Sequence, residues 1–564
     1  MENINYKKHN NHVLFKDLEN TDYANMYNIQ NYVPIYNHFF SLNDNNYNLI
    51  NLNLKYNLKK IISCDNDKKP CRTFKAIIES NEDKNIKHIF CKYSPLLDPL
   101  KYMTSKYSYD DSLYNLPNLN NNDNVHPKLL DTNNVSYTDC LFYYLSNTLN
   151  EKGFVNSLEF YGTFLGIQKN FTINIEDDIE YLVKSEEFHE NLGIHYNVED
   201  INDLAFNDDD ESGRYKEKLD ISDDINIEVD LSLNNENDPS EVSDNIFAFN
   251  LTEQEIKIND NNDQSINLID EDNLSSSDSS DESDTDDDND DTSTLSDKSQ
   301  DNTSNVSDES NISELQIEAT INKFPVQAIF IEKCDNTLDS YLMESEELSY
   351  DIWISILIQI IMTLLIYQKK YEFTHNDLHT NNIMYINTKL KYLYYKYNDK
   401  LYKVPTFGKI YKIIDFGRAI YNFNGKRFCS DSFSKGEDAY TQYNCEPYFN
   451  EKKKTIEPNY SFDLCRLGCS LFDFFIEDLN NVKEICSKNK IAKLVNEWCT
   501  DDKGKNVLYK NNGEERYPDF KLYKMIARTV HKHTPENQLN NKLFSTYVCN
   551  KREKCDNIMD IDTL

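Results

Sequence analysis

Glycine is scarce in this chain: it occurs 12 times in 564 residues, and the first is Gly153. A glycine-rich loop, which lets a backbone approach phosphate groups closely, is therefore excluded from everything that precedes Gly153. Positive charge is also in deficit, because 59 Lys and Arg face 97 Asp and Glu and the formal net charge is −38. That balance excludes binding of nucleic acid through a generally basic surface.

Paired cysteine motifs and long apolar segments are missing as well. The 13 cysteines are odd in number and form no CxxC pair, which favours free thiols in a reducing compartment over a disulfide framework or a zinc site. The first residues lack the apolar stretch of a signal peptide. The main apolar run, Ile352–Tyr367, is short for a membrane span and contains Ser355, Gln359 and Thr363. We interpret it as a buried core helix and expect no membrane contact.

The negative charge is concentrated in one segment. Residues 197–320 contain 39 Asp and Glu but only 5 Lys and Arg, so the other 440 residues are nearly neutral, with a net charge of −4. Mutually repelling carboxylates with little apolar surface to bury cannot collapse into a core. We therefore predict a long acidic disordered insertion in an otherwise folded body, and this segment could recruit basic proteins.

The remaining chain contains short extended segments and amphipathic helices. Apolar patterns and turn-forming residues predict strands at Asn57–Ser63, Thr73–Glu79, Ile86–Tyr93, Leu158–Ile167 and in the run that begins at Pro325. Periodic apolar positions predict helices at 135–150, Ile352–Tyr371, Asp463–Glu477, Val482–Trp498 and Pro518–His531. Strands in the first half and helices in the second half indicate an α+β fold.

Three motifs follow one another in the second half. They are His375–Ile383 (HNDLHTNNI), Ile413–Gly417 (IIDFG) and Phe462–Gly468 (FDLCRLG). Asp377 and Asn382 stand five residues apart in one loop, and Asp415 ends an apolar strand. Phosphoryl transfer needs a carboxylate that orients the attacking hydroxyl and oxygen ligands that hold Mg²⁺. The spacing therefore predicts Asp377 as catalytic base and Asn382 with Asp415 as metal ligands.

These motifs resemble those of the protein-kinase-like superfamily. HNDLHTNNI resembles the catalytic loop, IIDFG the D-F-G magnesium motif and SFDLCRLGCSLFDFF the helix whose Asp463 braces that loop. VQAIFIEKCDNTLDSYL resembles the last N-lobe strand and hinge, and the wider pattern is similar to serine/threonine kinases of giant DNA viruses. The resemblance implies ATP and Mg²⁺ as cofactors, structural support from His375, Phe416 and Gly417, and a protein substrate.

The resemblance also implies a phosphate-binding lysine on the third N-lobe strand. Lys92 in HIFCKYS fits that position, and Lys75 in RTFKAIIES is the alternative. For the acidic partner of this lysine, Asp139 stands on the helix at 135–150. Asp139 could instead form a helix-capping box with Ser136, and the acids Glu151 and Glu159 remain further alternatives.

Three departures leave the function open. The glycine-rich loop is missing before Lys92, which would suit an inactive pseudokinase scaffold. Asn376 replaces the arginine that precedes the catalytic Asp, and His379 replaces the cation found after D-L in many protein kinases. The D-L-H form also resembles small-molecule kinases for choline and aminoglycosides. The main expectation is nevertheless an active serine/threonine protein kinase.

The expected organisation is a two-lobed protein-kinase-like fold with the acidic insertion inside the N-lobe. An N-terminal extension covers 1–50, and the first part of the N-lobe covers 51–196. The insertion covers 197–320, the last N-lobe strand and hinge 321–336, the C-lobe 337–550 and a tail 551–564. An intracellular location is expected, in the host cytoplasm or the virion if the protein is viral.

Overall fold

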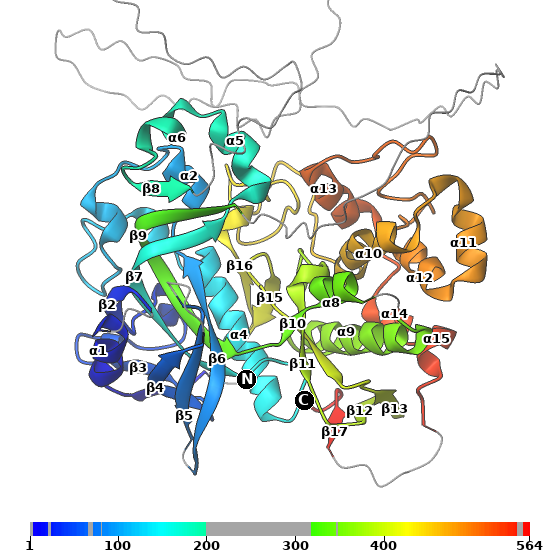
Figure 1. The fold of residues 1–564 in the computed structure, drawn as a ribbon, viewed down its shortest axis with the longest axis horizontal. Helices are drawn as coiled ribbons and strands as arrows, with labels where there is room; N and C mark the ends of the chain where they lie inside the picture. Colours follow the sequence, from blue (N-terminus) through cyan, green and yellow to red (C-terminus); the bar gives the residue numbers. More distant parts are fainter. Residues whose placement is uncertain are drawn as a thin grey trace, which may run out of the picture. The chain divides into compact units, whose positions relative to one another are not determined.

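The computed structural model describes residues 4–20, 24–65, 71–80, 82–198, 317–345, 348–549 and 557–564, which belong to one compact unit (Figure 1). Most of the predicted acidic insertion, 197–320, lies outside the described residues. Its two ends differ from the prediction, however. Residues 197 and 198 lie in β8 (Tyr196–Val198), and β9 (Glu318–Glu332) begins before residue 321; the two strands pair with each other. Both ends are thus held by backbone hydrogen bonds of one sheet.

A seven-stranded antiparallel sheet dominates the first half of the unit. Its order is β2-β7-β9-β6-β5-β4, with β8 attached to β9. Most of these strands were predicted from the sequence, and their bounds are β2 (Met26–Gln30), β4 (Asn57–Cys64), β5 (Thr73–Glu79), β6 (Lys84–Pro95) and β7 (Phe160–Asn174). The sheet is curled, and α4 (Val135–Glu151) packs against β7 and β9. This packing places α4 next to the middle of the sheet, where β6 pairs with β9.

The first 50 residues are part of this folded half rather than an extension. β2 pairs with β7 at the edge of the main sheet, and β1 (Tyr6–Lys8) pairs with β3 (Ile50–Leu52). Along the chain between β1 and β2, α1 (His12–Asn20) buries Leu14 and Leu18. Apolar residues are numerous in this Asn-rich stretch, and Met26 and Ile29 of β2 and Ile50 of β3 are buried as well. The prediction of a separate segment at 1–50 was therefore wrong.

Small sheets and hairpins join the two halves. The three-stranded sheet β10-β11-β14 carries two of the motifs at its ends, and the hairpin β12-β13 takes β17 as a parallel third strand. Part of the predicted tail, 551–564, is thus incorporated into a sheet. The bounds of these strands and of the β15-β16 hairpin are β10 (Asn336–Thr337), β11 (Ile383–Asn387), β12 (Tyr392–Tyr397), β13 (Lys400–Pro405), β14 (Lys409–Ile413), β15 (Ile420–Phe423), β16 (Lys426–Cys429) and β17 (Ile558–Asp560).

Helices make up most of the second half, around α9 (Tyr350–Tyr371). α9 has the length and apolar composition of a membrane span, but 17 of its 22 residues are buried in the unit, as predicted for a core helix. The main helices around it are α8 (Leu338–Glu344), α10 (Phe462–Phe475), α11 (Val482–Lys488), α12 (Lys490–Trp498) and α13 (Phe520–Thr529). The remaining short helices are α2 (Pro99–Met103), α3 (Pro127–Leu130), α5 (Ile179–Val183), α6 (Glu186–Asn191), α14 (Pro535–Gln538) and α15 (Lys542–Ser545).

Two cysteines depart from the expected free thiols. Cys64 and Cys71 form a disulfide with a Cα–Cα distance of 6.2 Å, at the point where β4 leads into β5. Antiparallel strands bring the two ends of a short connection together, which a count of cysteines cannot show. Buried thiols such as Cys91 and Cys140 are free, as expected.

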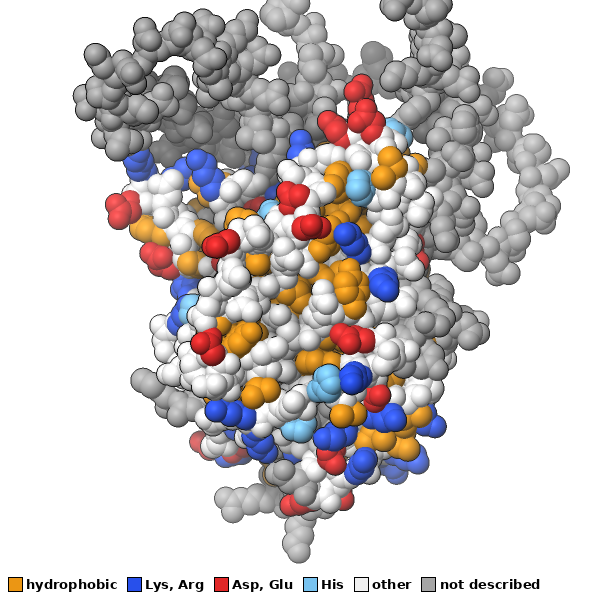
Figure 2. All heavy atoms as spheres, turned by 90° about the vertical axis from the view of Figure 1, so that its left-hand side faces the viewer, with side chains coloured by type: hydrophobic (Ala, Val, Ile, Leu, Met, Phe, Trp, Pro, Cys, Tyr) orange, Lys and Arg blue, Asp and Glu red, His pale blue; other side chains and the backbone are white. Residues whose placement is uncertain are grey.

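The described surface mixes both signs of charge on the side that faces the viewer in Figure 2, which is the side of α1 and β2. Acidic and basic side chains are interspersed there among hydrophobic ones, and lysine and arginine side chains gather toward its lower end. This distribution agrees with the near-neutral charge of the chain outside residues 197–320.

We predict that Gly468→Ala lowers the free energy of unfolding by about 1–3 kcal/mol. A Cβ atom at Gly468 would lie 2.9 Å from Cβ of Trp498 and 3.2 Å from Sγ of Cys499, at the contact between α10 and the end of α12. Neither atom is the flexible end of a long side chain, so the helices would have to separate. Urea denaturation measures the effect, and Ser470→Ala on the same helix is the control, with an expected change below about 0.5 kcal/mol. Equal stabilities of the two variants would contradict the prediction.

Candidate active site

Lys92 is the centre of the candidate site because its ammonium group bridges two acids. Nζ of Lys92 lies 2.8 Å from Oδ2 of Asp139 and 2.9 Å from Oδ1 of Asp415. Lys92 stands on β6, Asp139 on α4 and Asp415 in the loop after β14. Three elements far apart in the sequence therefore meet at one cation.

The two acids have different surroundings. Asp139 is 1% exposed, whereas half of the Asp415 side chain is exposed. Burial raises the pKa of Asp139 to about 6 although Lys92 opposes the shift. Partial loss of solvent also disfavours ionised Asp415. The charge and hydrogen bond of Lys92 outweigh this effect and lower the pKa of Asp415 to about 2. Asp415 is thus the carboxylate that stays charged and accessible.

Asp139 does not cap its helix. The N-cap of α4 is Asn134, whose side chain accepts a hydrogen bond from the backbone N–H of Ser136. Oδ1 of Asp139 instead accepts from the backbone N–H of Phe416 at 2.8 Å. Asp139 therefore contacts both Lys92 and the loop that carries Asp415, and the capping-box interpretation with Ser136 was wrong.

The other candidates for these two roles lie elsewhere. Lys75 on β5 is exposed and stands opposite His88 in the sheet. Glu151 accepts hydrogen bonds from the backbone of Lys55 and from Asn147. Glu159 forms an ion pair with Lys87. None of these side chains contacts Lys92.

The Asp415–Gly417 loop is anchored by aromatic packing and by its close contact with the start of α4. Asp415 has a φ of 61°, and its backbone N–H donates to the Tyr143 hydroxyl at 2.9 Å. Phe416 is fully buried, with its ring centroid 4.7 Å from that of Phe142 and 4.8 Å from that of Tyr143. A Cβ at Gly417 would lie 3.1 Å from Cγ2 of Val135. Glycine therefore lets this loop lie against the start of α4.

Asp463 braces the loop that carries Asp377. From the first turn of α10, its carboxylate accepts hydrogen bonds from the backbone N–H groups of His375, at 2.9 Å, and Asn376, at 3.0 Å. Asn376 has a φ of 67°. The buried His375 ring bonds through Nε2 to the carbonyl oxygen of Ile414, at 2.9 Å. His375 thus links the Asp377 loop to the residue that precedes Asp415.

Asn382 is oriented by bonds to its amide nitrogen. Nδ2 donates to the carbonyl oxygen of Asp377 at 2.9 Å and contacts Nε2 of His379 at 3.0 Å. These two bonds use both amide hydrogens and leave Oδ1 as the atom available to a cation. The backbone oxygen of Asn382 accepts from Ile414 at 3.0 Å, so Asn382 lies across the β11-β14 pairing from the Asp415 loop.

Two side chains near Asp377 were not singled out in the sequence. The Tyr523 hydroxyl, on α13, donates to Oδ1 of Asp377 at 2.8 Å, and Nε of Arg466, on α10, donates to the Tyr523 hydroxyl at 3.0 Å. Arg466 stands three residues after Asp463, so both lie on the same side of α10. An arginine amid the apolar residues of a core helix is a signal that could have been noticed; nothing in the sequence marks Tyr523.

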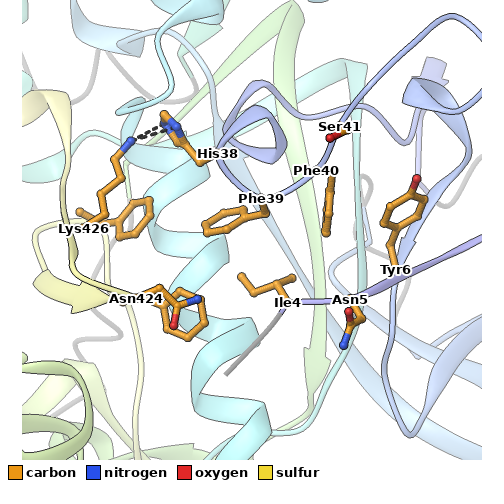
Figure 3. A pocket seen from close by; sticks show the side chains of 11 residues that line it. Ile4, Asn5, Tyr6, His38, Phe39, Phe40, Ser41, Asn424 and Lys426 are labelled. Atoms are coloured by element: carbon orange, nitrogen blue, oxygen red, sulfur yellow. Dashed lines mark hydrogen bonds between the residues drawn. The ribbon is translucent and has the colours of Figure 1, made fainter. Parts of the chain in front are cut away.

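A hollow of about 560 Å³ lies elsewhere, between the N-terminal segment and the β15-β16 hairpin (Figure 3). Phe39, Phe40 and Phe428 line it, and Lys426 bonds to the His38 ring at its rim. It contains none of the site residues predicted from the sequence, so we do not assign it to the site around Lys92.

No known protein-family model matches the chain, and no curated protein shows a significant match to it.

Proposed function

We propose that the chain is an ATP-dependent phosphotransferase of the protein-kinase-like superfamily, with two lobes and a protein serine or threonine as acceptor. The observation that carries the proposal is the bridge from Lys92 to Asp139 and Asp415. It joins a strand lysine, a helix acid and a loop acid, which is similar to the lysine–acid ion pair and the magnesium-binding Asp of protein kinases, and Asp377 and Asn382 stand in the neighbouring loop. Lys92 also stands on the third strand of the run β4-β5-β6.

Each residue has a distinct role in this proposal. Lys92, held by Asp139, would orient the nucleotide phosphates, while Asp415 and Oδ1 of Asn382 would ligate Mg²⁺. Among the described residues no three His, Cys, Asp or Glu side chains form a metal cluster, so phosphate and water oxygens would complete the coordination. Magnesium neutralises charge on the transferred group. Asp377 would accept the proton of the acceptor hydroxyl.

Two other functions compete with this one. A pseudokinase scaffold, in which residues 197–320 recruit basic proteins, is suggested by the missing glycine-rich loop. No glycine precedes Gly153, and the connection from β4 to β5 is closed by the disulfide Cys64–Cys71. A small-molecule kinase for choline-like or aminoglycoside-like alcohols is suggested by His379 after Leu378.

Turnover of ATP with Mg²⁺ distinguishes these functions. We expect phosphate transfer to a generic basic protein, and Asp377→Asn should lower kcat by about 100-fold or more because the amide cannot accept the proton. The matched control is Asp473→Asn, since Asp473 also accepts a tyrosine hydrogen bond, at 3.0 Å from Tyr509, but lies outside the site. Transfer to choline or an aminoglycoside instead would favour the small-molecule kinase, and no turnover in the wild-type protein would favour the scaffold.

A further inference from the structure

The side chain of Asp377 already has a donor at one of its two oxygens. Tyr523 donates to Oδ1, and Arg466 donates to the same tyrosine hydroxyl. The Arg466 guanidinium also lies over the Tyr523 ring, 5.2 Å from its centroid. The chain Arg466–Tyr523–Asp377 therefore runs from α10 through α13 to the loop.

Tyr523 is fixed by more than its hydroxyl. Its ring stacks on Phe520 at a centroid distance of 5.1 Å with an angle of 11° between the rings. Burial raises the pKa of Tyr523, so the phenol remains a neutral donor. α13 is itself attached to the neighbouring segment, because Arg528 donates to the carbonyl oxygen of Thr441 at 2.7 Å. The hydroxyl is thus held in place before any acceptor binds.

The loop needs a cation from outside. The loop segment His375–Ile383 contains no lysine or arginine, and Nε2 of its His379 contacts Nδ2 of Asn382 at 3.0 Å. Arg466 is close enough for its charge to act on Asp377. Arg418 also acts on Asp377, but its guanidinium is paired with Asp438. Among the described residues, no carboxylate forms a salt bridge with Arg466.

We propose that Arg466 and Tyr523 are positioning residues for Asp377: Tyr523 fixes Oδ1, leaves Oδ2 free for the acceptor hydroxyl, and connects Asp377 to a positive charge that the loop lacks. The inference rests on the proposed function, in which Asp377 is the base. A base held in one orientation loses less rate to misalignment than a base that rotates freely. Arg466 and Tyr523 come from two helices, so the acceptor side of the site depends on α13 being in place.

Kinetics of Tyr523→Phe test the proposal. The substitution keeps the ring stack and removes only the hydroxyl, so we expect kcat to fall about tenfold or more while KM for ATP changes less than about twofold. Arg466→Gln should behave similarly, and Arg466→Lys should retain more activity because it keeps the charge. The matched control is Tyr509→Phe, which removes another tyrosine–aspartate hydrogen bond outside the site. A rise in kcat for Tyr523→Phe would overturn the proposal, since it would show that the tyrosine blocks the acceptor.

A second measurement does not depend on turnover. Thermal unfolding of the wild type, Tyr523→Phe, Asp377→Ala and the double variant forms a double-mutant cycle. We expect the shift in Tm of the double variant to be smaller than the sum of the two single shifts, because both variants remove the same hydrogen bond. Additive shifts would overturn the pairing of Tyr523 with Asp377 even if the protein transfers phosphate. Coupled shifts in a protein without turnover would instead support the pairing and count against the proposed function.

Discussion

Replacing Asp415 by Asn is expected to lower Mg²⁺-dependent ATP turnover by about 100-fold or more, roughly 3 kcal/mol of activation free energy. Asp415 is the half-exposed acid of the site, and Lys92 lowers its pKa to about 2, so at neutral pH it presents a full negative charge. Asparagine has nearly the same shape and remains compatible with the φ of 61° at this position. The variant therefore removes charge and little else, and steady-state kinetics over a range of Mg²⁺ concentrations measure the loss.

The matched control for this substitution is Asp399→Asn. Asp399 has a φ of 59°, similar to that of Asp415, but stands in the turn between β12 and β13, away from Lys92. We expect the activity of this control to stay within twofold of the wild type. Equal turnover by Asp415→Asn and the wild type, at every Mg²⁺ concentration, would contradict the assignment of Asp415 as a metal ligand.

The second large effect is expected from separating Lys92 and Asp139. Asp139→Ala removes the buried partner of Lys92 and also leaves the backbone N–H of Phe416 without its acceptor. We expect the free energy of unfolding to fall by about 3 kcal/mol, because breaking one side of a buried ion pair leaves an uncompensated charge. Lys92→Met should have a similar effect, and the double variant should lose less than the two single variants together. Both single variants should also lack ATP turnover.

A substitution in a second buried ion pair serves as the control that distinguishes a loss of stability from a loss of activity. Lys128 and Asp431 form a salt bridge of 2.7 Å with side chains that are 17% and 8% exposed. Lys128→Met should destabilise the protein, but at a temperature where it remains folded the variant should keep its turnover. Normal ATP turnover by folded Lys92→Met would show that Lys92 does not orient the phosphates. A fully additive double-mutant cycle would show that Lys92 and Asp139 are not paired.

Much of the site could be predicted from spacing along the chain. The interval from Asp377 to Asn382 and the position of Asp415 after an apolar strand depend on local backbone geometry. The structure accordingly places Asn382 directly before β11 and Asp415 two residues after β14, and these two strands pair with each other. Lys92 could be preferred over Lys75 because the order of three strands is also local information. The helix that carries Asp463 follows from its 3.6-residue apolar period.

The tertiary structure alone decided the partners that come from distant parts of the chain. From the sequence, Asp139 could be a helix cap or the partner of Lys92. The packing of α4 against the sheet places it in contact with both Lys92 and the backbone N–H of Phe416. Tyr523 lies 146 residues after Asp377, and only the docking of α13 brings the two within 2.8 Å. Pairing of β2 with β7 and of β17 with β12 likewise depends on surfaces that do not exist until the core has formed. Periodicity reports which side of an element is buried, but not which element covers it.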